Sequence, residues 1–137
     1  MIPSLGVPLM DDDHAHLDEL LHGVRDAGDG ELPALLATIE AETRAHFGHE
    51  EDLMRKRGLG ILACHSIQHQ LFLAEFSVGR TAIEAGDMAA LRHFLTSTLP
   101  ELLAAHVDTV DRMTAFLLLS TDRPDPVRVP PQHDTVL

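Results

Sequence analysis

The chain has 137 residues and a mass of 15.0 kDa, which is the size of a single domain with one core. Hydrophobic residues make up 45% of it and charged residues 23%, as in soluble globular proteins. The formal net charge of -12 argues against nucleic acids and anionic membrane surfaces as partners, because both are polyanions. The 10 histidines equal the lysines and arginines together, so their positions need an explanation.

No apolar run approaches the roughly 20 residues that a membrane span requires. The N-terminus lacks the basic region and the cleavage pattern of a secretory signal. The single cysteine, Cys64, excludes an internal disulfide and fits a reducing compartment. We therefore expect a cytoplasmic protein. We also expect Cys64 to be a small buried residue rather than a nucleophile, because it points about 100° away from its neighbour His65 on a helix.

Apolar residues recur at helical spacing along the chain, and no stretch alternates with a period of two. A first helix is predicted to begin near Asp11–Asp13, whose carboxylates suit an N-terminal cap, and to end before residues 28–30. A second helix is predicted over about 32–57. Pro33 is tolerated in its first turn, and the basic residues 55–57 suit its last turn.

A third helix is predicted over about 61–85 and a last one over about 88–119. Pro100 interrupts the last helix, which is therefore either two pieces or one kinked helix. Four helices with short connections predict an all-α, antiparallel up-down-up-down four-helix bundle over residues 1–119. Residues 120–137 hold four prolines and little to bury, which predicts a tail without regular structure.

The faces predicted to point inward carry polar as well as apolar side chains. Their members are His14, Leu17, Leu21, Val24, Leu35, Ile39, His46, Glu50, Leu53, Ile61, His65, His69, Phe72, Phe76, Leu99, Leu103, His106, Val110, Met113 and Leu117. The phenylalanines are all expected in the core: Phe47, Phe72, Phe76, Phe94 and Phe116. Phe47 is also expected to wall the site beside His46, and His49 to face outward or flank it.

Six residues of metal-ligand type lie on these inward faces, and Asp111, paired with His106, completes a set of seven: His14, His46, Glu50, His65, His69, His106 and Asp111. Two pairs are four residues apart and so point the same way from a helix. His106 and Asp111 are five apart, which separates them by about 140° on a regular helix. That last pair converges only through side-chain reach or a local widening of the helix.

Buried imidazoles and carboxylates without partners cost several kcal/mol, and a cation offsets that cost. Any one of these pairs alone is more often a solvated pair than a metal site. Together, on four helices, they predict a buried metal centre. Five imidazoles and two carboxylates exceed what one tetrahedral zinc uses, and they suit two ions bridged by carboxylates. The donor set is compatible with iron and less so with zinc, copper or manganese.

The order of these motifs resembles the bacterial hemerythrins and the wider hemerythrin and myohemerythrin family over about residues 5–117. The matching segments are Gly-Val-Pro-Leu-Met-Asp-Asp-Asp-His14, His46-Phe-Gly-His-Glu50, His65-Ser-Ile-Gln-His69 and His106-Val-Asp-Thr-Val-Asp111. The chain departs from the family in lacking Trp, with Leu102 at one usual Trp position and Leu59-Gly60 where Tyr-Pro is common.

The resemblance implies a non-haem centre of two Fe ions, bridged by an oxo or hydroxo group, that binds O2 reversibly. One iron would be held by His65, His69 and His106, and Glu50 and Asp111 would bridge the pair. The other iron would be held by His14 and His46 and would keep a position open for O2. Leu103 and Val107 are expected to form an apolar wall beside that position.

The function that follows is oxygen storage, delivery or sensing, without enzymatic activity and with O2 as the ligand. The alternative is a di-iron enzyme such as a ferroxidase or an oxidase. Ferritin-like enzymes use mostly carboxylates, with Glu-x-x-His motifs that this chain lacks. A metal-free interaction bundle would leave the inward histidines without a role. The sequence indicates no macromolecular partner.

Overall fold

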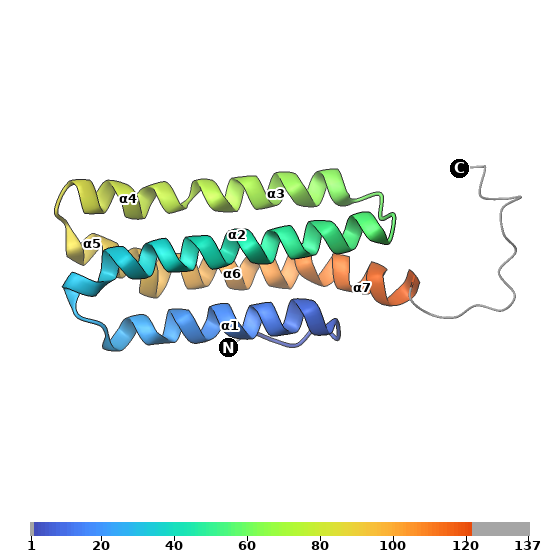
Figure 1. Ribbon diagram of the computed structural model, residues 1–137, viewed down its shortest axis with the longest axis horizontal. Helices are drawn as coiled ribbons and strands as arrows, with labels where there is room; N and C mark the ends of the chain where they lie inside the picture. Colours follow the sequence, from blue (N-terminus) through green and yellow to red (C-terminus); the bar gives the residue numbers. More distant parts are fainter. Residues whose placement is uncertain (1, 122–137) are drawn as a thin grey trace, which may run out of the picture.

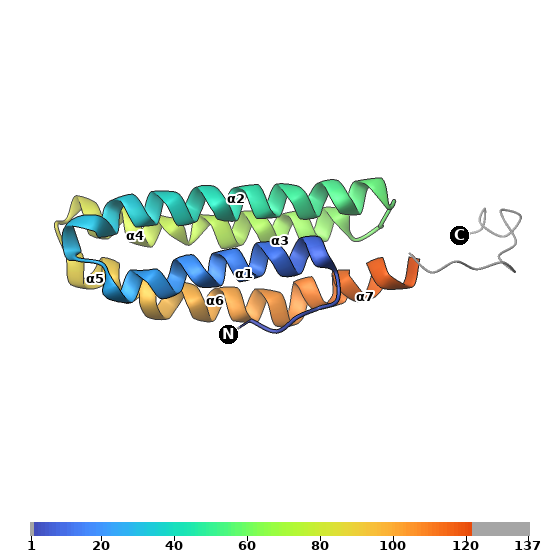
Figure 2. The same ribbon diagram turned by 60° about the horizontal axis from the view of Figure 1, so that its bottom comes forward.

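The computed structural model describes residues 2–121 and shows a bundle of four helical arms (Figure 1). Successive arms run in opposite directions, as Figure 2 shows from a second side. Residues 2–121 contain no strand. The predicted all-α, up-down-up-down bundle is therefore confirmed.

The first arm is α1 (Pro8–Gly23), followed by the short 3-10 helix η1 (Val24–Asp26). A second 3-10 helix, η2 (Asp29–Glu31), leads into α2 (Leu32–Lys56), which agrees closely with the prediction of 32–57. The third arm is α3 (Leu62–Ala74) and α4 (Phe76–Glu84), which are divided at Glu75. The fourth arm consists of α5 (Met88–His93), the π turn η3 (Phe94–Thr98), α6 (Leu99–His106), the π turn η4 (Val107–Asp111) and α7 (Arg112–Thr121).

The first helix begins earlier than predicted, at Pro8 rather than at Asp11–Asp13. Proline suits this first turn because its fixed φ is already helical and it has no N–H to satisfy. Asp11 does not cap the helix. Its carboxylate instead accepts hydrogen bonds from the Leu5 and Gly6 amides and from the Ser4 hydroxyl. It thereby fastens the N-terminal segment, residues 2–7, to the first turns of α1.

Pro100 interrupts the last arm through a π turn. Proline cannot donate the i→i−4 hydrogen bond of a regular helix, and its ring crowds the preceding turn. Here η3, which ends two residues before Pro100, supplies the wider i→i+5 turn. The arm is therefore one helical run with a local defect.

The second π turn, η4, changes which residues face the core. An i→i+5 turn contains one more residue than a regular turn, so the inward face beyond it moves on by one position. The buried residues are Thr114, Ala115 and Leu118. The predictions for Met113 and Phe116 were therefore wrong: they are 57% and 65% exposed. Five further predicted core residues are only half-buried: Leu35, Leu53, Ile61, Val110 and Leu117.

The core consists of two apolar clusters separated along the bundle. The larger one contains four of the phenylalanines, and the smaller one consists of Val7, Met10, Ala115 and Leu118. On α1, His14 lies between Met10 of the smaller cluster and Leu17 of the larger one. A polar layer therefore crosses the bundle between the two clusters.

Two further expectations concern the surface and the C-terminus. Cys64 is exposed, so the prediction that it is buried was wrong. Its neighbour His65 takes the inward position on α3, which turns Cys64 toward solvent. The predicted tail lies outside the described residues from position 122 onward, and α7 itself reaches Thr121. Within residues 2–121, no helix combines the length and apolar character needed to cross a membrane.

One close helix contact provides a test of the packing. A Cβ at Gly79 on α4 would lie 2.9 Å from both methyl groups of Leu36 on α2, whereas Gly48 on α2 faces open space. We expect Gly79→Leu to lower the free energy of unfolding by about 1–3 kcal/mol through overpacking. The control Gly48→Leu should raise it by up to about 1 kcal/mol through helix propensity. Urea unfolding measures both, and equal stabilities would refute this contact.

Candidate metal centre

The seven predicted ligand residues all lie in the polar layer between the two apolar clusters. α1 contributes one, α2 and α3 two each, and the fourth arm the last two: His14, His46, Glu50, His65, His69, His106 and Asp111. The most exposed of them is His106, at 7%. Sequence spacing therefore predicted correctly that these side chains meet inside the bundle.

These residues form two overlapping groups, within each of which the candidate donor atoms lie within 4.8 Å of one another. The five-residue group consists of Glu50, His65, His69, His106 and Asp111. The four-residue group consists of His14, His46, Glu50 and Asp111. The two carboxylates, Glu50 and Asp111, belong to both groups.

Each carboxylate divides its two oxygens between the groups. Glu50 Oε1 lies 3.2 Å from His65 Nε2 and 3.1 Å from His69 Nε2. Glu50 Oε2 lies 2.8 Å from His46 Nε2 and 3.6 Å from His14 Nε2. Asp111 divides in the same way, with Oδ1 on the side of the five-residue group and Oδ2 2.9 Å from His14 Nε2.

The π turn η4 brings His106 and Asp111 together. It spans Val107–Asp111, between the last residue of α6 and the carboxylate. His106 Nε2 and Asp111 Oδ1 are 3.1 Å apart, a separation that a five-residue spacing on a regular helix does not favour. Of the two routes left open by the sequence, a local widening of the helix is the one observed.

Three of the histidines form a hydrogen bond through Nδ1, on the side of the ring that faces away from the two groups. His65 Nδ1 lies 2.6 Å from Thr114 Oγ1, and the Thr114 hydroxyl donates to the Val110 carbonyl. The hydroxyl proton is thus engaged, so Nδ1–H of His65 is the donor, and its Nε2 faces Asp111 and Glu50. His46 Nδ1 and His69 Nδ1 donate to carboxylates. Such outer contacts orient metal-binding imidazoles and make them stronger donors.

Sequence reasoning missed the carboxylates behind His46 and His69. Asp13 Oδ2 lies 3.0 Å from His46 Nδ1, and Glu51 Oε2 lies 2.6 Å from His69 Nδ1. Hydrogen bonds from the histidines lower the pKa of Asp13, against a partial burial that would raise it. The only signal in the sequence is adjacency, because each acid directly neighbours a predicted ligand along the chain.

Phe47 and His49 lie where they were expected. The Phe47 ring stacks on His69 with centroids 3.8 Å apart, and it also contacts His46 and His106 at 5.6 Å and 5.3 Å. His49 flanks the site with its side chain 52% exposed, and its Nδ1 lies 2.8 Å from Asp13 Oδ2. Phe47 therefore restricts the rings from the apolar side, and His49 lies toward solvent.

The charges in the layer compensate one another. Burial opposes ionisation of both carboxylates, but hydrogen bonds from the surrounding histidines hold the pKa of Glu50 and of Asp111 below its usual range. Burial also opposes a charge on the imidazoles. Contacts with Asp111 and Glu50 nevertheless raise the pKa of His14 and of His65 to about 9. In the metal-free protein, protons on these rings therefore balance the negative charge of Glu50 and Asp111, as bound metal ions could.

Several buried polar atoms suit a metal better than they suit one another. Among residues 2–121, His46 Nε2, Glu50 Oε2 and His106 Nε2 have no hydrogen-bond partner. Each of these imidazole nitrogens nevertheless lies near a carboxylate oxygen. His46 Nε2 and Glu50 Oε2 are only 2.8 Å apart without hydrogen-bond geometry. Buried polar atoms are normally paired, so the orphaned atoms in this layer indicate cation binding. Imidazole nitrogen with carboxylate oxygen is the donor set of iron, zinc and related ions.

Comparisons with known proteins agree with this geometry. The family model described as the hemerythrin HHE cation binding domain matches residues 5–115. A bacteriohemerythrin from Ralstonia nicotianae is 37% identical over 109 residues, which are 80% of this chain and 79% of that protein. A bacteriohemerythrin from Pseudomonas aeruginosa is 30% identical over 88 residues, 61% of this chain. The chain spans 58% of that second relative. No solved structure matches the chain significantly.

Metal binding should release protons. Because the pKa values of His14 and His65 in the folded, metal-free protein are about 9, both rings are protonated at pH 7 and must lose a proton to coordinate. We expect Co2+ to bind the metal-free protein more tightly at pH 9 than at pH 6.5, with net proton release at pH 7. Calorimetric titration in two buffers of different ionisation enthalpy counts the protons. Binding of Co2+ without proton release at pH 7 would contradict the assignment of a positive charge to His14 and His65.

Proposed function

Because the chain belongs to the hemerythrin family, we propose that it is a reversible O2-binding protein with a non-haem di-iron centre. The observation that carries the proposal is the pair of overlapping groups that share both carboxylates. Two ions held in this way lie next to each other, which a single-ion site does not require. Bound iron would supply the O2 chemistry, and the protein's residues would hold and shield it.

We assign the ligands by group. His65, His69 and His106 would hold one iron, and His14 and His46 the other, with Glu50 and Asp111 bridging them. The two positions then differ by one protein ligand. The position with fewer protein ligands is the one that can accept an external molecule without losing a side chain.

The surroundings favour binding over reaction with water. Leu103 and Val107 are 3% and 0% exposed and belong to the same apolar cluster as Phe47. Phe47 in turn contacts three of the candidate ligand rings. An apolar enclosure limits water and proton access to a reduced ligand, which supports reversible binding rather than an oxidase or ferroxidase reaction. We propose oxygen storage, delivery or sensing in the cytoplasm as its role.

Iron content and spectroscopy test this function. After iron-replete expression, the purified protein should hold two irons per chain. Its visible spectrum should change on exposure to air and return under argon, and His69→Ala should reduce both the iron content and the spectral change. Iron removal should lower the melting temperature, because ligand burial is then uncompensated. One zinc per chain and no iron would refute the proposal.

Azide should distinguish the two positions. In oxidised iron-loaded protein, a small anion should enter beside His14 and His46, because the other position already has five candidate protein ligands. A crystal structure of the azide complex is the direct measurement. Azide beside His65, His69 and His106 would overturn the assignment of ligands to positions and leave the seven-residue site intact.

A further inference from the structure

Asp13 and Glu51 stand behind one histidine of each group. His46 belongs only to the four-residue group, and His69 belongs only to the five-residue group. Asp13 is on α1 and reaches His46 on α2, whereas Glu51 is on α2 and reaches His69 on α3. A carboxylate can only accept from Nδ1–H, so each acid holds a proton on Nδ1 and directs Nε2 toward its group.

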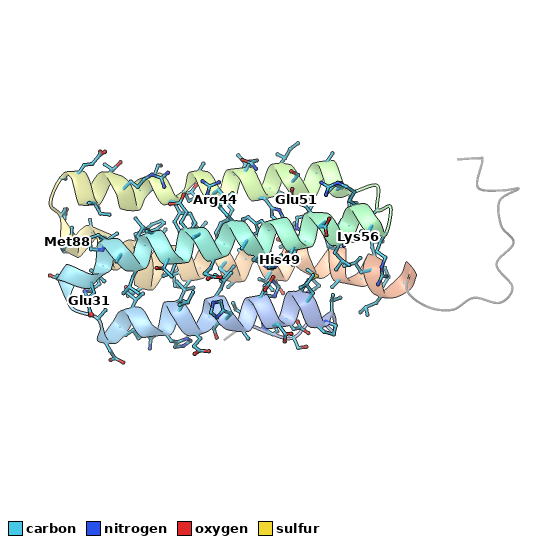
Figure 3. All side chains as sticks on the ribbon, in the orientation of Figure 1. Glu31, Arg44, His49, Glu51, Lys56 and Met88 are labelled. Atoms are coloured by element: carbon cyan, nitrogen blue, oxygen red, sulfur yellow. The ribbon has the colours of Figure 1, made fainter. Side chains whose placement is uncertain are left out.

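The two carboxylate–histidine contacts are not equivalent. His69 Nδ1 contacts Glu51 at 2.6 Å, and within residues 2–121 no other histidine contacts that acid. Asp13 Oδ2 instead serves two rings, His46 at 3.0 Å and His49 at 2.8 Å. His49 is not in either group, and its side chain is 52% exposed. Figure 3 shows His49 and Glu51 on α2, with Glu51 on the side of α3.

We propose that Asp13 and Glu51 are positioning residues that set the donor strengths of His46 and His69 separately. His49 weakens the contact between Asp13 and His46, because it shares the same carboxylate oxygen. The proposal rests on the proposed function only in requiring one metal ion in each group. A carboxylate on Nδ1–H makes the ring a stronger donor to a metal. A longer and shared contact does so less, so the four-residue group binds its metal with the weaker donors.

The consequence is a second difference between the two positions, beyond the number of ligands. Stronger donors stabilise the more highly charged form of a metal. The unshared contact of Glu51 with His69 would therefore favour the oxidised state of a metal in the five-residue group. The shared contact of Asp13 with His46 would leave a metal near His14 and His46 with a higher reduction potential. His49, a partly exposed residue without direct contact to the site, thereby tunes the position that is open to an external ligand.

The first test uses Co2+ and metal-free protein, and it needs neither iron nor O2. Asp13→Asn keeps a hydrogen-bond acceptor for His46 but removes the charge, and Glu51→Gln is the matched change for His69. We expect each variant to weaken one of two Co2+ binding steps by about 10- to 100-fold, and the two variants to weaken different steps. Weakening of the same step by both variants, or a change below about threefold in both, would overturn the proposal.

The second test separates donor tuning from a merely structural link between α1 and α2. His49→Phe removes the competing donor while keeping a ring on the surface. In iron-loaded protein, we expect Asp13→Asn to raise the reduction potential and His49→Phe to lower it. If Asp13 and His49 only fasten the helices, both variants lower the melting temperature and neither moves the potential. That result would overturn the proposal, as would shifts in the same direction.

The outcomes also separate this inference from the proposed function. A wild-type protein that binds no Co2+ in either group would refute the metal centre and this inference together. Two Co2+ ions bound by the wild type and, unchanged, by both carboxylate variants would refute only the inference. Far-UV circular dichroism of the metal-free variants establishes folding. If Asp13→Asn does not fold, Glu51→Gln and His49→Phe still decide the question.

Discussion

The burial of two carboxylates is the constraint on which the rest of this bundle depends. Glu50 and Asp111 are 1% and 0% exposed, and an ionised carboxylate in such a place is costly unless it is paired. Five imidazoles, supplied by all four arms, meet them. Because each arm must present its donor at the same level, the polar layer fixes the relative heights of the helices as no apolar contact could.

The apolar core accommodates this layer by dividing in two. The larger cluster closes one side of the site through Phe47, and the smaller cluster closes the other side with Met10 and Ala115. Apolar side chains at both boundaries keep the dielectric low, which strengthens every charge interaction within the layer. The unpaired ring and carboxylate atoms lie between these boundaries, where a cation can pair with them.

The sequence was sufficient for the bundle and for the ligand layer because both depend on residue type and on a regular period. α2 matched its predicted bounds closely, and its His46 and Glu50 pointed inward as expected. Met113 and Phe116 failed because a π turn interrupts that period. No propensity of the residues in that turn announces the defect. The one indication in the sequence was that His106 and Asp111, two residues of metal-ligand type, are five positions apart.

Contacts between arms could not be read from the chain. Asp11, Asp12 and Asp13 are identical in type, yet their roles differ completely. Asp11 binds the backbone of the N-terminal segment, Asp12 is exposed, and Asp13 supports a histidine on another helix. Which role each takes depends on the angle at which α1 passes α2 and on where the chain enters the helix, and neither quantity is local to the sequence.

The π turn η4 has a consequence for how the protein tolerates change. In a sequence alignment, a one-residue gap inside a helix reads as a minor shift. Removing Asp108 or Thr109, which are exposed, would spare every proposed ligand and would leave His106 and Asp111 four residues apart, on one regular helical turn. A π turn contains one residue more than a regular turn, so its loss would keep Asp111 and Thr114 on the inward face. The turn is therefore a place where the length of the chain can change by one residue without moving the proposed ligands off the inward face.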